Sequence, residues 1–271
     1  MEINKDTSYM IGLFQTDGSM SLEGKNKGRF RLELSSRDED IIYKLEKIIP
    51  YKYTTRKRRR KISIKEHDYN NETIQLTVYN LNFRNELLSC GIPYGKKSKI
   101  IKPPLHIENL SIKDYVRGLY DGDGSLGMTK DNIPYISFTT DSDDIAFFLN
   151  EYINEVTGKP LKDIKRNNRD NIYNIVITKE DAVNFCNEVY YDGCLSLDRK
   201  YQKSIEVKKW VRPEGMIISN KLSWDDHQDY FISNHSLKES MEYLDRSENS
   251  IKMRLWRLKD ILNITIYSLF F

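Results

Sequence analysis

The sequence predicts an α+β protein made of two similar halves, followed by a small all-α domain of three helices. Three observations lead to this prediction: a ten-residue segment occurs twice, the same order of predicted elements comes after each copy, and the chain ends in a basic stretch with helical spacing. In each half the predicted order is αββαββα. We expect the halves at residues 1–105 and 106–210, a linker at 211–222 and the helical domain at 223–271.

Composition excludes several classes of protein before any motif is considered. No stretch approaches the roughly 20 apolar residues that a membrane-spanning helix needs, and the first ten residues lack the pattern of a signal peptide. The three cysteines form no Cys-x-x-Cys pair and the four histidines are scattered, which disfavours a disulfide scaffold and a zinc site. We therefore expect a protein of a reducing compartment with no membrane partner.

The repeated segments are Met10–Ser19, with the sequence MIGLFQTDGS, and Val116–Ser125, with the sequence VRGLYDGDGS. Their aspartates, Asp17 and Asp123, lie a domain's length apart, so the repeat indicates two duplicated domains and not a solenoid of short units.

The residues after each copy also match in their pattern. Alternating residues indicate a strand, apolar helical spacing indicates a helix, and two further strands and a helix come next. In the first half these are strands at 29–35, 61–65 and 73–79 and helices at 41–49 and 81–90. In the second half they are strands at 135–139, 161–166 and 172–178 and helices at 145–153 and 180–190.

Each repeated segment ends a short helix with an Asp-Gly pair, which we interpret as half of a metal site. The glycine suits the left-handed conformation that often comes after a helix. A carboxylate at the negative end of a helix dipole is unfavourable unless a cation lies beside it.

Small residues recur four positions apart in each helix, and they let the two helices pack closely and bring both aspartates together. These residues are Gly12 and Thr16 in the first helix, and Gly118 and Gly122 in the second. Two adjacent carboxylates repel each other unless divalent cations neutralise them, and paired carboxylates suit Mg²⁺ and the hydrolysis of phosphodiesters.

Both segments resemble the LAGLIDADG motif, and the order of elements over residues 5–210 is similar to the fold of the LAGLIDADG homing endonucleases. The resemblance implies a saddle of two antiparallel four-stranded sheets over the DNA major groove. It implies a site-specific double-strand DNA endonuclease that leaves 3′-extended ends. It also implies a monomer that needs no protein partner and takes a long non-palindromic target. The implied cofactor is Mg²⁺, as two or three ions that Mn²⁺ can replace.

The resemblance also implies roles for particular residues. The eighth motif residue is the metal-binding catalytic acid, and it corresponds to Asp17 and Asp123; Thr16 and Gly122, directly before them, are further metal-binding candidates. The first copy departs from the second at Gln15 and Thr16, but neither is the principal acid.

A lysine near each scissile phosphate corresponds to Lys97 and Lys200, which lie at similar distances after the two acids. Such a lysine stabilises the charge that develops on the phosphoryl oxygens or positions the water. Their neighbours Lys96 and Arg199 compete for the same role.

The predicted strands place polar side chains on one face, where arginine, glutamine and glutamate can pair with base edges. Residues 52–65 hold eight basic residues and no acid, which suits neutralisation of phosphates. The candidate DNA-binding residues of the two halves are Arg29, Arg31, Glu33, Ser35, Arg37, Arg56, Arg58, Lys61, Ser63, Lys65, Gln75, Thr77, Tyr135, Ser137 and Thr139.

In the C-terminal region from Trp224 onward, the spacing of apolar residues predicts three helices, near 224–234, 236–244 and 247–260, with Ser247 as the N-cap of the last. It resembles Myb-like and helix-turn-helix modules, which implies that the third helix enters a DNA groove. The residues we expect to contact DNA are Asn249, Lys252, Arg254 and Arg257, with Met253 and Trp256 on the same face.

Two alternatives stay open at this point: an RNA-binding intron maturase, and a DNA-binding regulator that kept the fold but lost the chemistry. Retention of both aspartates and both lysines disfavours the regulator. We expect the protein to act in the cytoplasm or nucleoid, in a bacterial, phage or organellar setting.

Overall fold

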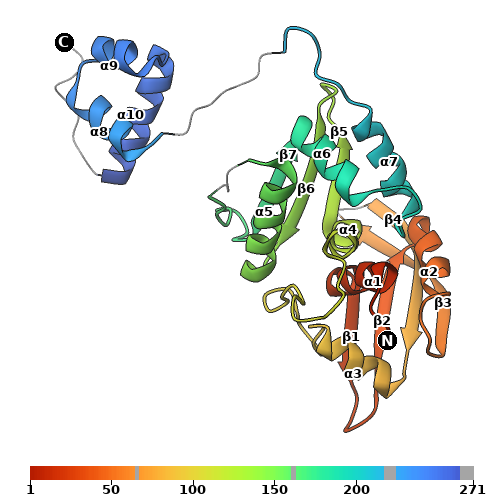
Figure 1. Ribbon diagram of the computed structural model, residues 1–271. Coiled ribbons are helices and arrows are strands. Elements are labelled where there is room, and N and C mark those ends of the chain that lie inside the picture. Colours follow the sequence, from red (N-terminus) through yellow and green to blue (C-terminus); the bar gives the residue numbers. More distant parts are fainter. Residues whose placement is uncertain (65–66, 160–162, 217–223, 263–271) are drawn as a thin grey trace. The chain divides into compact units, whose positions relative to one another are not determined.

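The computed structural model describes residues 1–64, 67–159, 163–216 and 224–262 (Figure 1). The chain divides into two compact units, Met1–Pro213 and Glu214–Phe271. Among the described residues, no helix is both long and apolar enough to cross a membrane.

The first half of unit 1 carries a four-stranded antiparallel sheet in the order β1-β2-β4-β3. Its elements are α1 Lys5–Thr16, β1 Gly18–Leu22, β2 Gly28–Ser35, the short 3-10 helix η1 Ser36–Asp38, α2 Glu39–Leu45, β3 Tyr53–Ile64, β4 His67–Val78 and α3 Leu81–Ser89. The register pairs Glu33 of β2 and Arg56 of β3 with Gln75 of β4. Because side chains alternate along a strand, these three lie on the same face of the sheet.

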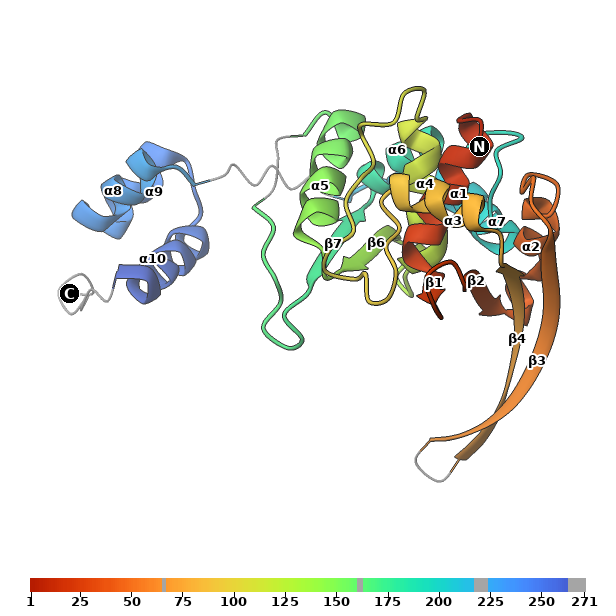
Figure 2. The same ribbon diagram turned by 90° about the horizontal axis from the view of Figure 1, so that it is seen from below.

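The opposite face of this sheet is apolar and forms the core of the first half. Phe30, Leu32, Leu76 and Val78 are all fully buried there. The hairpin of β3 and β4 is longer than the sequence predicts and extends well away from the body of the unit (Figure 2).

The second half repeats the arrangement with a smaller sheet, in the order β5-β6-β7. Its elements are α4 Ile112–Asp123, β5 Gly124–Met128, β6 Pro134–Thr140, α5 Asp143–Thr157, β7 Tyr173–Thr178, α6 Glu180–Val189 and α7 Asp198–Lys208. Sequence patterning had not indicated α7 as a separate helix.

The strand predicted at 161–166 is wrong for the described residues 163–166, which form only an isolated bridge between Arg166 and Tyr173. The cause is long-range: Arg166 donates to Asp141 and to Asp143, at 2.8 and 3.0 Å, and thereby holds the segment against the start of α5. The implied second four-stranded sheet therefore has three strands in the described part of the chain.

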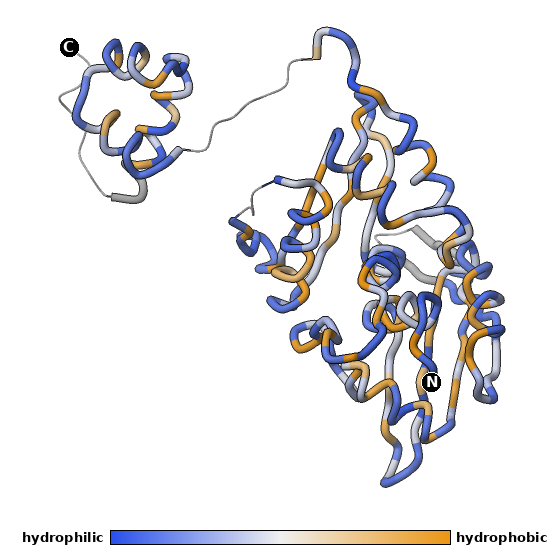
Figure 3. Tube along the Cα trace, in the orientation of Figure 1, coloured by the Kyte–Doolittle hydropathy of each residue, from blue (hydrophilic) through white to orange (hydrophobic). Residues whose placement is uncertain are grey.

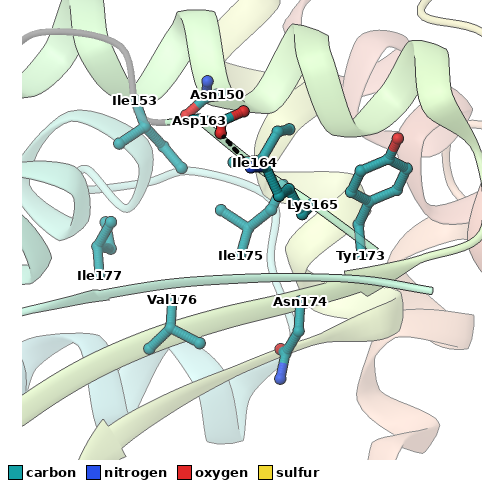
Figure 4. Close-up of a pocket in the computed structure, with 10 residues that line it drawn as sticks. All are labelled: Asn150, Ile153, Asp163, Ile164, Lys165, Tyr173, Asn174, Ile175, Val176 and Ile177. Atoms are coloured by element: carbon teal, nitrogen blue, oxygen red, sulfur yellow. Dashed lines mark ion pairs between the residues drawn. The ribbon is translucent and has the colours of Figure 1, made fainter. Parts of the chain in front are cut away.

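A pocket lies beside β7, between this strand, α5 and residues 163–165 (Figure 4). Ile153 of α5 and Ile175 of β7 line it, and Lys165 pairs with Asp163 at 2.9 Å at its rim. In the first half the corresponding strand, β4, is paired on both sides.

The two halves meet through α1 and α4, which run side by side through the centre of unit 1 (Figures 1 and 2). Their cores interlock: Ile11 of α1 packs in the core of the second half, and Leu197 of the second half packs in the core of the first. Figure 3 shows apolar stretches in the strands and central helices and polar stretches in the loops.

Unit 2 contains α8 Asp226–Asn234, α9 Leu237–Leu244 and α10 Glu248–Leu262. This confirms three C-terminal helices. Ile232 and Ile251 are fully buried between them, and Ser247 accepts from the backbone N–H of Ser250, as an N-cap does.

Candidate active site where helices α1 and α4 end

The contact between α1 and α4 depends on residues without a side chain. A Cβ added to Gly12 would lie 2.2 Å from the carbonyl oxygen of Tyr115, and one added to Gly118 would lie 2.1 Å from that of Tyr9. The two backbones therefore touch, as the small-residue spacing predicts.

The same close approach places the two acids together. A Cβ on Gly122 would lie 1.9 Å from Thr16 Oγ1 and 3.0 Å from Asp17 Oδ2. The carboxylate of Asp17 thus lies against the last turn of α4, where Asp123 is the final residue. The structure brings the two predicted acids to one place.

The predicted reason for the glycine after each acid is wrong. Neither Gly18 nor Gly124 has a positive φ, and Gly124 has a φ of −84°. Instead, a Cβ would lie 2.5 Å from the carbonyl oxygen of Phe14 at the first site and 2.6 Å from that of Tyr120 at the second. Each glycine lets the chain turn directly from the helix into a strand.

The pKa values of both acids are raised above the usual value of an aspartate. Burial raises the pKa of half-buried Asp17 to about 6, and the nearby negative charge of Asp123 adds to the shift. The surrounding protein also raises the pKa of Asp123, although this side chain is exposed to solvent. Among the described residues, neither carboxylate has a hydrogen-bond donor or an ion-pair partner.

Each lysine implied by the family resemblance lies at the end of the helix that carries the acid of its own half. Lys97 Nζ donates to the carbonyl oxygens of Gln15 and Thr16, both at 2.5 Å. Lys200 Nζ donates to the carbonyls of Tyr120 and Asp121, both at 2.6 Å, and to that of Gly124 at 2.8 Å. Because the last carbonyls of a helix have no partner within it, an ammonium group there satisfies them.

The pKa values of both lysines are lowered. Burial lowers the pKa of Lys97, and it lowers the pKa of Lys200 to about 8. Nearby carboxylates oppose both shifts. The charged forms therefore depend on the acids around them.

The competing bases lie elsewhere. Lys96 is exposed, and Arg199 is bound to Asp38 through two hydrogen bonds, one of them 3.0 Å long. The geometry thus favours Lys97 and Lys200. As for Thr16, its hydroxyl donates to the carbonyl of Leu13 at 2.8 Å, so it turns back onto its own helix.

Two tyrosines belong to the site that sequence reasoning passed over. Tyr9 donates to Asp121 at 2.7 Å, and Tyr115 donates to Gln15 at 2.6 Å, so each joins one helix to the other. They occupy equivalent positions, one residue before the repeated segments. Extending the repeat by one residue would have found them.

An open hollow adjoins Asp123 at the end of α4. Thr16, Lys97, Asp123, Thr139 and Asp141 are among the residues that line it. The hollow connects the helix ends with the polar side of β6, and so provides space beside both Asp123 and Lys97.

The polar face of the first sheet contains most of the predicted DNA-binding residues. Arg29, Arg31 and Ser35 are half-buried on it. Glu33 accepts from Thr73 at 2.9 Å and from Gln75 at 2.8 Å, and it pairs with Arg60. Gln75 and Thr77 are only 4% and 5% exposed, because the central strand is covered by these neighbours.

The hairpin continues this face. Arg56 and Arg60 are exposed, while Arg58 is half-buried; alternation places all three on one side of β3. Lys61 and Arg37 are exposed as well. Of the remaining predicted contacts here, Lys65 lies outside the described residues, and Ser63 is placed only as a backbone position in β3.

The predicted DNA-binding residues of the second sheet are uncharged and lie along β6. Tyr135 and Ser137 are half-buried and Thr139 is exposed, all on the same side of β6.

In unit 2, Asn249 and Arg257 are exposed on α10, and Lys252 is half-buried. The guanidinium of Arg254 donates to Asp229, with one hydrogen bond of 2.7 Å.

The chain was compared with known proteins. Residues 112–190 match the family described as the LAGLIDADG-like domain, and residues 6–74 match the family described as the WhiA LAGLIDADG-like domain. No curated protein sequence matches the chain.

Three solved structures are similar at low sequence identity. The homing endonuclease I-WcaI bound to its DNA recognition sequence is 15% identical, with a TM-score of 0.49, over 76% of this chain and 88% of that one. The I-SmaMI LAGLIDADG homing endonuclease bound to cleaved DNA is 13% identical, with a TM-score of 0.47, over 77% and 88%. The N-terminal LAGLIDADG domain of DUF199/WhiA is 14% identical, with a TM-score of 0.42, over 69% and 82%.

The two family matches fall one in each half. The first begins in α1 and ends in β4, and the second begins at α4 and ends just after α6. Each therefore contains the helix that ends in an acid and the sheet that comes after it. The first half of unit 1 is thus similar to the WhiA LAGLIDADG-like domain and the second half to the LAGLIDADG-like domain, and helices α1 and α4 join the two halves.

Proposed function

We propose that this protein is a site-specific, double-strand DNA endonuclease of the homing type. The observation that carries the proposal is the arrangement at the helix ends. Two adjacent carboxylates without protein partners among the described residues lie there with two lysines, half-buried Lys97 and buried Lys200. Structural needs alone do not explain two repelling acids at the negative ends of two helices.

The donor set at the helix ends suits Mg²⁺. Asp17 and Asp123 offer hard carboxylate oxygens, and the described residues include no group of three or more histidine, cysteine or acidic side chains that would enclose a metal completely. Mg²⁺ commonly takes one or two carboxylates and completes its coordination with water and phosphate oxygens. Bound there, it would neutralise the acids and supply an activated water.

The protein groups would divide the remaining work. Lys97 and Lys200, next to the acids, would stabilise negative charge on the phosphoryl oxygens. Since each lysine belongs to one half, each set of acid and lysine would serve mainly one DNA strand. Two sets in one chain make a monomer sufficient, and a non-palindromic target is expected because the halves differ in sequence.

The polar sheet face would hold the DNA. Arg29, Arg31, Arg56 and Arg58 place positive charge along it, and Nε of Arg31 is buried without a hydrogen-bond partner in the described structure. A buried donor without an acceptor is costly, so an incoming phosphate or base would complete it. Unit 2, through α10, would add a second DNA contact.

A DNA-binding regulator without nuclease activity is the second candidate. The match of residues 6–74 to the WhiA LAGLIDADG-like domain favours it. The two candidates share the DNA-binding face and differ in the chemistry of the acids, so cleavage separates them.

The test begins with a randomised linear DNA library, incubated with the protein and Mg²⁺ or Mn²⁺, and then sequencing of the ends produced. A nuclease yields 3′-extended ends at one sequence. On that sequence, Asp17→Asn and Asp123→Asn should each reduce double-strand cleavage at least a thousandfold and leave DNA affinity within a few-fold. A library that is bound selectively but never cut would establish the regulator instead.

A further inference from the structure

The residue two positions before each acid makes contacts that the proposed chemistry has not used. In the first half this residue is Gln15, which is fully buried. Its Nε2 donates to the carbonyl oxygens of Cys90 at 3.2 Å and Lys102 at 3.0 Å. Cys90 caps α3, and Lys97 lies between the two carbonyls in sequence. Gln15 thus ties together both ends of the segment that carries Lys97.

The equivalent residue of the second half, Asp121, does the same with different chemistry. It is 1% exposed, and it accepts from Tyr190 Oη at 2.8 Å and from the backbone N–H of Leu197 at 2.7 Å. Tyr190 caps α6 and Leu197 is the N-cap of α7, whose first turn contains Lys200. Asp121 therefore joins both ends of the connection that leads to Lys200.

Each of these residues also accepts one hydrogen bond from the opposite half. Tyr115 on α4 donates to Gln15, and Tyr9 on α1 donates to Asp121. The orientation of each anchor is thereby fixed by the helix that carries the other acid. A buried hydrogen-bond network whose groups are satisfied makes the segments that it joins rigid, and here it occurs once in each half.

We propose that Gln15 and Asp121 are positioning residues, each of which holds the lysine of its own half at the helix end. One part of this proposal, the DNA strand that each residue affects, rests on the proposed nuclease function. Each anchor acts on one lysine, and neither acts on both, because the clamped segments belong to separate halves.

The two anchors differ in charge, and this makes the two lysines unequal. Asp121 places a carboxylate near Lys200 that favours its ammonium form, while the amide of Gln15 gives Lys97 no such help. The charged groups that face Lys200 are Asp121 on α4, Arg199 on α7, Asp17 and Asp123 at the helix ends, and Asp38 in η1.

The experiment measures single-turnover nicking of each strand separately, on a duplex labelled at both 5′ ends. Asp121→Leu should slow one strand about a hundredfold, the size of effect expected when a catalytic group moves by an ångström, and leave the other within a few-fold. Gln15→Met should slow the opposite strand. Equal slowing of both strands by either variant would overturn the proposal, because a general loss of structure acts on both.

Milder variants keep the test valid if Asp121→Leu fails to fold. Tyr190→Phe removes one donor to Asp121 and should slow the Lys200 strand several-fold. Its matched control is Tyr152→Phe, since Tyr152 is another buried tyrosine of the same half whose hydroxyl has no hydrogen-bond partner in the described structure. If the control slows that strand as much as Tyr190→Phe does, the anchoring role is refuted.

Asp121→Asn separates charge from geometry. The amide has the same shape. Its oxygen can accept from the backbone N–H of Leu197 and from Tyr9, and its NH2 group can donate to Tyr190 Oη, so Lys200 stays in place but loses its negative neighbour. The pKa of Lys200 should then be lower than in the wild-type protein, and the alkaline limb of nicking on that strand should move to lower pH. A limb that does not move contradicts the assignment.

A second readout does not require cleavage. Limited acetylation with acetic anhydride, analysed by mass spectrometry, reports the reactivity of individual lysines in the free protein. Asp121→Leu should expose Lys200 to the reagent and leave Lys97 protected; Gln15→Met should do the reverse. If the wild-type protein cuts no DNA, the nuclease proposal fails while this result still decides the anchoring. Exposure of both lysines by one variant, or of neither by both variants, refutes it.

Discussion

The two halves of unit 1 agree at the helix ends and differ in their sheets. Both end a central helix in an acid, and both cap that helix with a lysine from a later segment. Yet the first half has four strands and an arginine-rich hairpin, whereas the second has three described strands and a neutral row of Tyr135, Ser137 and Thr139. A shared site thus tolerates different surfaces.

The difference reflects the constraints on each region. The helix ends are bound by backbone contact between α1 and α4, where even one added carbon collides. Apart from buried Gln75 and Thr77, the polar sheet faces carry half-buried or exposed side chains, which can vary with less effect on packing. We infer that the halves are nearly equal in the proposed chemistry and unequal in how they would hold DNA.

The largest effect should come from the helix contact, where the halves are most alike. Gly12→Ala and Gly118→Ala each place a Cβ within about 2.2 Å of a backbone oxygen, and each should lower the free energy of unfolding by about 3 kcal/mol. Chemical denaturation of the purified variants measures this. Gly24→Ala is the control, because its Cβ would meet nothing within 4 Å. If Gly12→Ala and Gly118→Ala lower the free energy of unfolding by clearly different amounts, the two halves do not contribute equally to the helix contact.

The next effect concerns the sheets, where the halves differ. Replacing Arg56 and Arg58 together with glutamine should weaken DNA binding about tenfold and reduce the slope of log K against log salt by about 2, since two phosphate contacts are lost. The charge-matched control is Lys5→Gln with Lys113→Gln, at the helix ends opposite the acids. An unchanged slope would show that the hairpin does not meet phosphates.

Much of this comparison could be predicted from the sequence. The repeat carries Asp17 and Asp123 at equivalent positions, and the family resemblance implied Lys97 and Lys200 at similar distances after them. The structure places all four at the helix ends. The three C-terminal helices were predicted from local spacing alone. Local patterns and repeats are visible in a single chain because they need no knowledge of distant partners.

The features that the sequence did not reveal depend on contacts between distant residues. The described residues 163–166 of the strand predicted at 161–166 form no strand, and Arg166 pairs there with Asp141 and Asp143. Gln75 is buried because the central strand β4 lies between two neighbours, an order that no local pattern reveals. The ion pair of Arg254 with Asp229 likewise joins two helices.

A smaller effect should appear in the free energy of unfolding as the pH changes. The pKa of Asp17 is raised to about 6 in the folded protein, so the folded state favours its protonated form. That contribution is complete below about pH 4 and is lost as the pH rises through 6. Asp17→Asn removes the buried charge and should stabilise the metal-free protein by about 1 kcal/mol at pH 8, with little change at pH 4. Destabilisation at pH 8 would contradict the assigned repulsion.

The smallest effect should come from unit 2, which occurs once and so would add to the inequality between the two sides of the DNA. Arg257 is exposed on α10, whereas Arg254 on the same helix is held by Asp229. Arg257→Gln should therefore weaken DNA binding about threefold, reduce the salt slope by about 1 and leave the melting temperature unchanged. Arg254→Gln should instead lower the melting temperature of unit 2, because it leaves Asp229 without its partner. A nuclease footprint should shorten on one side only with Arg257→Gln. If both variants change stability alone and the footprint stays the same, α10 supports its own unit and does not read DNA.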